Sequence, residues 1–65
     1  MDPKICLTEC DQAISDGELA VAREKLTDYL IWRARDGFQP VDVANSGKRG
    51  DEFAAICQAR IIDWK

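Results

Sequence analysis

The stretch DGELAVAREKLTDYLIWRARDG, residues 16–37, decides the fold because it is the longest run with a helical period and a stop signal. Its apolar residues recur at the spacing that lines one side of an α-helix. They are Leu19, Ala22, Leu26, Tyr29 and Leu30. Asp16 is expected to cap the start of this helix, and Gly37 to take the left-handed conformation that ends it. On its exposed side, Lys25 and Asp28 are placed to pair. The stretch therefore predicts a central helix over about residues 17–35.

A first helix is predicted before this stretch, over residues 3–15. Asp2 followed by Pro3 is typical of a helix start, because the carboxylate caps the first turn and proline lacks only an N–H that would be unpaired there. One face of this helix is apolar. It carries Cys6, Leu7, Cys10, Ala13 and Ile14, whereas Ile5 falls outside it. Because the break at residues 15–17 is short, the first two helices are expected to form an antiparallel hairpin.

A long irregular connection, residues 37–50, follows the central helix. Its apolar residues Phe38, Val41 and Val43 are expected to pin it to the core. Residues 41–44 form either a helical turn opened by Pro40 or a short extended piece, and we favour the turn because an isolated strand would have no partner. A third helix is predicted over about 52–64, capped by Asp51. Its core face comprises Phe53, Ile56, Cys57, Ile61 and Trp64. The fold class is therefore all-α, a small three-helix domain.

Length and composition agree with one small helical domain spanning residues 1–65, whose core is close to the smallest that folds unaided. Apolar residues make up 46% and charged residues 32% of the chain, which is not a disordered composition. No apolar run approaches the roughly 18 residues that a membrane span requires. The acidic start has no secretory or transit signal, so we expect a cytoplasmic protein that does not bind membranes.

The chain contains three cysteines and no histidine. Three thiolates fall short of the four Cys or His ligands that structural zinc usually takes, so the cysteines are predicted to be buried apolar residues. No cysteine has a basic partner at a suitable spacing, and the serines fall in predicted turns. We therefore expect no metal, no cofactor and no catalytic residue.

Several large apolar residues lie off the predicted core faces, which indicates a second surface that becomes buried against a partner. On the third helix, Arg60 lies within the core face. Its charged head either reaches water or a nearby carboxylate, or marks the rim of an interface. The predicted function is a protein-interaction module, an adaptor, inhibitor or regulator of the size that phages and plasmids often encode. Its partner is itself, as a homodimer, or another protein. The predicted interface residues are Val21, Ile31, Trp32, Ala55, Ala59, Arg60 and Ile62.

The apolar residues off the core faces have an alternative explanation, because a chain this small can bury some of them itself.

A second function also stays open, because charge is distributed unevenly. Residues 1–28 hold seven acidic and three basic residues, whereas residues 29–65 hold five acidic and six basic ones. Basic residues beside an aromatic are typical of nucleic-acid binding. The alternative patch comprises Trp32, Arg33, Arg35, Lys48 and Arg49. A net charge of −3 opposes it, because negative charge repels phosphate.

Overall fold

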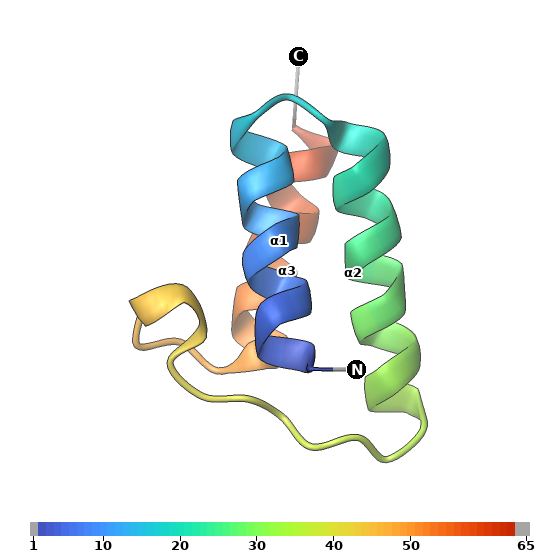
Figure 1. Cartoon of the computed structure of the whole chain (residues 1–65), viewed down its shortest axis with the longest axis vertical. Coiled ribbons are helices and arrows are strands. Elements are labelled where there is room, and N and C mark those ends of the chain that lie inside the picture. The colour runs from blue at the N-terminus through green and yellow to red at the C-terminus, as the bar shows by residue number, and fades with distance from the viewer. Residues whose placement is uncertain (1, 64–65) are drawn as a thin grey trace.

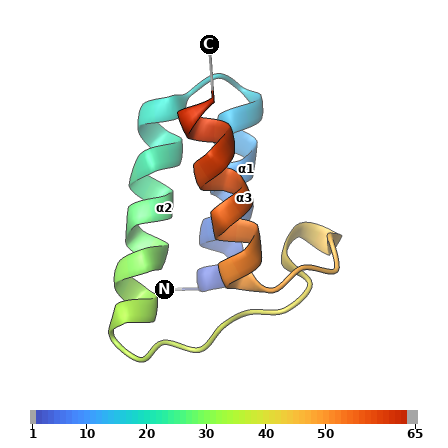
Figure 2. The same ribbon diagram turned by 180° about the vertical axis from the view of Figure 1, so that it is seen from behind.

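A computed structural model describes residues 2–63, and all regular secondary structure within that range is helical. The elements are α1 (Pro3–Ser15), α2 (Leu19–Ala34), the short 3-10 helix η1 (Val43–Asn45) and α3 (Gly50–Ile62). Helices α1 and α2 stand side by side as an antiparallel hairpin, and α3 runs along one face of it (Figures 1 and 2). The predicted three-helix fold, with its hairpin and long connection, is confirmed. None of the described helices has the length and apolarity that crossing a membrane requires.

The start of α1 and the turn after it follow from local interactions. The Asp2 carboxylate accepts hydrogen bonds from the N–H groups of Lys4 and Ile5, at 3.0 and 3.4 Å. At the other end, Gly17 has a φ of 76° and the chain closes a Schellman motif. In this motif the Glu18 N–H donates to the Ala13 carbonyl at 2.8 Å. The hairpin turn is therefore built from backbone bonds that a left-handed glycine permits.

Both predicted ends of the central helix were wrong in detail. Asp16 ends α1 instead of capping α2, because the Schellman motif uses residues 16–17 and α2 begins only at Leu19. At its C-terminus, the left-handed residue is Asp36, with a φ of 63°, and Gly37 follows it. The Gly37 N–H donates to the Trp32 carbonyl at 3.0 Å, which closes a second Schellman motif with an aspartate in the usual glycine position.

The core lies between the three helices and includes every apolar residue predicted for α1. Three other residues predicted for the core are not buried: Leu30 on α2 and Ile56 on α3 are exposed, and Leu19 at the start of α2 is half-buried. On α3 the buried face runs through Ala54 in place of Ile56, because small side chains there let the helix lie close against the hairpin. This face comprises Gly50, Phe53, Ala54, Cys57 and Ile61. Trp64, also predicted for this face, lies outside the described residues.

The connection touches the core at fewer points than predicted. Val43 is fully buried and Pro40 is buried against Gly50, but Phe38 and Val41 are 63% and 62% exposed. In place of the expected helical turn over 41–44, the chain makes a short 3-10 turn at 43–45 that is irregular, because Asp42, Ala44 and Asn45 all have left-handed backbone. One turn of 3-10 helix offers a single inward position, which Val43 occupies.

Two predicted side-chain roles were also wrong. Asp51 does not cap α3, because the helix begins at Gly50, two residues before the predicted start, and Arg49 holds the cap position. Lys25 pairs with Glu9 of α1, its Nζ lying 2.8 Å from Oε2, and not with Asp28. Packing of the hairpin brings Glu9 within reach of Lys25, which a single-helix spacing argument does not capture.

Candidate functional site

Two aromatic side chains pack on each other at the surface where α2 ends. The ring centroids of Trp32 and Phe38 are 5.6 Å apart with planes at 88°, an edge-to-face arrangement. The Trp32 Nε1–H donates to the Phe38 carbonyl at 3.1 Å, so the polar atom of the indole is satisfied. The exposed Ile31 lies beside them, and we call Ile31, Trp32 and Phe38 the aromatic corner. A hollow of about 200 Å³, lined by Asp28, Ile31, Trp32 and Arg35, opens there.

Gly37 makes this packing possible. A Cβ added at Gly37 would overlap both the Trp32 ring and the Trp32 carbonyl oxygen. Only glycine lets the backbone pass so close to the indole, and that passage brings Phe38 back onto Trp32. The spacing of Trp32, Gly37 and Phe38 is thus a structural requirement of the aromatic corner.

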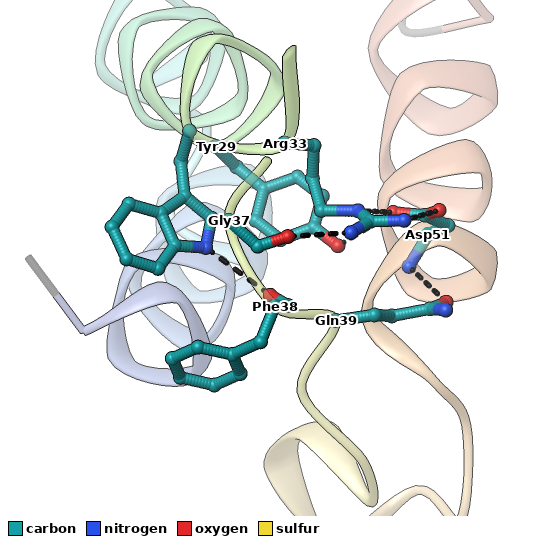
Figure 3. A network of polar contacts seen from close by, with 7 residues as sticks. Tyr29, Arg33, Gly37, Phe38, Gln39 and Asp51 are labelled. Carbon is teal, nitrogen blue, oxygen red and sulfur yellow. Dashed lines mark hydrogen bonds and ion pairs between the residues drawn. The ribbon is translucent and has the colours of Figure 1, made fainter. Parts of the chain in front are cut away.

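A polar network behind the aromatic corner fixes the same segment to α3 (Figure 3). The Arg33 guanidinium binds both carboxylate oxygens of Asp51, with Nε–Oδ1 at 2.8 Å and Nη2–Oδ2 at 2.9 Å. Its Nη1 also donates to the Gly37 carbonyl at 2.6 Å. The hydroxyl of the buried Tyr29 also donates to Asp51 Oδ1, at 2.7 Å. Gln39 completes the network, because its Oε1 accepts the backbone N–H of Asp51 at 3.0 Å.

The network shifts the ionisation of its members. Hydrogen bonds from Arg33 and then from Tyr29 hold the pKa of Asp51 below its ordinary value. Burial, followed by the bond to Asp51, raises the pKa of the Tyr29 hydroxyl. The carboxylate is therefore ionised and the phenol neutral at neutral pH. This arrangement holds the segment in place against α3.

The predicted interface residues fall into separate groups. Ile31 and Trp32 belong to the aromatic corner, and Val21 lies exposed near the other end of α2. The outer surface of α3 carries the exposed residues Ala55, Ala59 and Ile62. Arg60 is exposed, and its guanidinium pairs with Asp11 of α1. This agrees with the first of the two alternatives given for Arg60, in which its charged head reaches water or a nearby carboxylate.

The residues of the alternative nucleic-acid patch are also only partly together. Trp32 and Arg35 line the same hollow. Arg33 is bound to Asp51, and the Lys48 Nζ lies 3.6 Å from Glu52 Oε1. Within residues 2–63, Arg35 and Arg49 have no carboxylate partner. Two of the four cations are thus already paired within the chain.

The three cysteines are buried and unbonded to one another. The Cys6 thiol donates to the Lys25 carbonyl at 3.0 Å, and the Cys10 thiol donates to the Ala22 carbonyl at 3.2 Å. Burial raises the pKa of Cys6, and the Cys10 thiol together with burial raises that of Cys57. Among the described residues, no group of three His, Cys, Asp or Glu side chains is placed to hold a metal ion.

Sequence reasoning missed Phe38 and Val41 as surface residues. Both lie in an irregular stretch, where no helical period assigns an apolar residue to a core. The available signal was the pair Gly37-Phe38, which follows shortly after a helix that carries Trp32 in its last turn. This pair indicates that the backbone at Gly37 passes close to the Trp32 ring, but only once the Schellman motif at the end of α2 is known.

Comparison of the chain with models of known protein families, with curated protein sequences and with solved structures found no match. Its function is therefore inferred from its own residues.

Proposed function

We propose that this chain is a small non-catalytic protein-interaction module that forms a homodimer through the aromatic corner. The observation that carries the proposal is Phe38, which is 63% exposed although its segment is fixed by Gly37, Arg33 and Trp32. A large apolar side chain held rigidly in water loses little conformational freedom when a partner covers it. Aromatic residues of this kind dominate the binding energy of small interfaces.

The energetics are compatible with a dimer of micromolar affinity. Burying each large apolar side chain contributes roughly 2 kcal/mol by area. A symmetric dimer buries the aromatic corner twice, whereas association costs at least about 4 kcal/mol in lost freedom. The chain exposes 4229 Å² in all, and a standard interface covers about 800 Å² per partner, roughly a fifth of this surface.

Light scattering on the full chain at tens of micromolar tests the proposal. We expect about twice the chain mass of 7.3 kDa, and a shift towards monomer for Trp32→Ala and for Phe38→Ala. Ile62→Asp is the matched control, because Ile62 is an exposed apolar residue on α3 away from the aromatic corner. A monomeric unmutated chain would contradict the dimer. A dimer broken by Ile62→Asp alone would move the interface to the outer surface of α3.

The nucleic-acid alternative retains one specific observation, since Arg35 lines the hollow beside Trp32. An arginine next to an aromatic platform suits a single-stranded backbone and its bases. Fluorescence anisotropy with a short single-stranded DNA separates the two functions. Binding at about 0.15 M salt that weakens steeply with added salt and with Arg35→Gln would favour nucleic acid, because phosphate contacts release counterions. We expect no such binding.

A further inference from the structure

Within residues 2–63, one side of α2 has no other helix against it. Figures 1 and 2 show α2 at the edge of the bundle, with α1 and α3 on the same side of it. The residues that α2 buries there are Ala22, Leu26 and Tyr29. Its open side lines the hollow of about 200 Å³ at the aromatic corner. The lining residues are Asp28, Ile31, Trp32 and Arg35.

These four residues repeat at the spacing of one helix face. Counted from Asp28 they stand at i, i+3, i+4 and i+7, so they form a single stripe along two turns of α2. The stripe is acidic at its start, apolar in its middle and basic at its end. Both charged residues are exposed. We call Asp28, Ile31, Trp32 and Arg35 the α2 stripe.

The two charges of the α2 stripe are not paired inside the described chain. Seven residues of helix separate Asp28 from Arg35 by about 10 Å along the axis, which is too far for a direct ion pair. Lys25, one turn before Asp28, is bound to Glu9 at 2.8 Å. Within residues 2–63, neither Asp28 nor Arg35 lies in an ion pair. Each is therefore available to a charge on a second molecule.

We propose that two copies of the chain dock through their α2 stripes in antiparallel orientation, with Asp28 of each copy paired to the partner's Arg35. This inference rests on the proposed homodimer and specifies its geometry. Phe38, which packs on Trp32 with ring centroids 5.6 Å apart, borders the same contact. Exposed ion pairs add little affinity, so the two pairs act mainly on orientation and on the choice of partner.

Self-complementarity favours this orientation. In a symmetric dimer the same surface meets itself, so its charges must match after a twofold rotation. With the axis between Ile31 and Trp32 of two antiparallel helices, residues equally far before and after the axis face each other. Asp28, three residues before Ile31, then meets the partner's Arg35, three residues after Trp32. A parallel contact would instead oppose like charges at both positions.

The α2 stripe suits a second copy better than a nucleic acid. Its net charge is zero, because one carboxylate and one guanidinium lie at its two ends. A carboxylate beside Ile31 and Trp32 repels phosphate, whereas it attracts the arginine of a second copy. The same self-match explains why an acidic and a basic residue stand at equal distances from the apolar pair.

Charge reversal tests the pairing, with light scattering over a range of chain concentrations as the readout. Asp28→Arg and Arg35→Asp should each weaken the dimer at least about tenfold, because each opposes like charges twice. The double variant Asp28→Arg/Arg35→Asp restores opposite charges at both pairs and should dimerise about as well as the wild type. Arg23→Asp is the matched control. It makes the same charge change on α2 outside the α2 stripe, and should leave the dimer nearly unchanged.

A mixing experiment tests the orientation. The wild type and the double variant should each form dimers but should not pair with each other, because an antiparallel contact between them opposes like charges at both positions. Native mass spectrometry of a mixture with one protein ¹⁵N-labelled measures the mixed dimer. A mixed dimer in excess of the statistical share would overturn the antiparallel pairing, because a parallel contact gives that result.

The variants also separate this inference from the proposed dimer. A dimer that is lost in Phe38→Ala but unchanged in Asp28→Arg and Arg35→Asp would keep the aromatic corner as the interface and overturn the pairing. Single variants that fall apart without recovery in the double variant, while circular dichroism shows full helix content, would also overturn it. A monomeric wild type would reject both the dimer and the pairing.

Discussion

Arg33 on α2 holds Asp51 on α3 through both carboxylate oxygens, at 2.8 and 2.9 Å, while its third nitrogen donates to the Gly37 carbonyl. One guanidinium thus joins two helices and the segment that presents Phe38. A planar fork of donors can make all three bonds at once, which a lysine ammonium cannot do with the same geometry. The presentation of the aromatic corner therefore depends on this particular side chain.

Replacing Arg33 with lysine should lower the urea midpoint of unfolding, although the charge is retained. The loss comes from the bidentate bond and from the Gly37 contact together. Lys48→Gln is the matched control, because it removes a single exposed ion pair at 3.6 Å and should leave the midpoint nearly unchanged. Equal midpoints for the two variants would show that the fork contributes nothing.

Asp51 should make the protein sensitive to acid. Its pKa is held below the ordinary value of 3.8, so the carboxylate contributes stability above about that pH and loses it as the pH falls further. Asp51→Asn should be less stable than the wild type at neutral pH and show a flatter decline below about pH 4. Urea unfolding at a series of pH values measures this. If the stability of the wild type and of Asp51→Asn fell in parallel as the pH was lowered, Asp51 would not be the source of the acid sensitivity.

Two glycines should respond differently to alanine. At Gly50 a Cβ would overlap the Tyr29 hydroxyl and the Pro40 ring, so Gly50→Ala should cost about 2 kcal/mol or more through overpacking. At Gly47 the Cβ would meet open space, but its φ of 73° is strained for alanine, so Gly47→Ala should cost about 1 kcal/mol. Urea unfolding ranks the two, and a reversed order would show that the contact with Pro40 relaxes easily.

The thiols should react slowly in the folded protein. The pKa values of Cys6 and Cys57 are raised, so these two thiols hold little thiolate at neutral pH. The hydrogen bond with Cys57 lowers the pKa of Cys10, but Cys10 is fully buried and a reagent cannot reach it in the folded chain. A thiol reagent should label the native chain over hours and all three cysteines at once after denaturation. Fast labelling of the native protein would contradict the buried placement, and stoichiometric zinc in the purified protein would contradict a purely structural role.

Local sequence determined the features that depend on neighbours within a turn or two. The Asp2-Pro3 start and the turn at Gly17 follow from contacts between residues a few positions apart. The helical period also predicts the buried face of α1 apart from Pro3, which is buried as well. The short break after α1 likewise imposed the hairpin, and with it the order of the helices. These features can be predicted because capping, turn geometry and helical period act along a single segment of chain.

Tertiary packing decided the rest. Lys25 pairs with Glu9 across the hairpin and not with Asp28 on its own helix. On α3, Ala54 is buried where Ile56 was predicted to be. Phe38 faces water because Gly37 lets the backbone pass close to Trp32. Arg33 binds both the Gly37 carbonyl and Asp51, which lies eighteen residues after Arg33, and so fixes this segment to α3. The rotation of each helix about its axis is set by the fit of two surfaces, and a helical period fixes only which residues share a face.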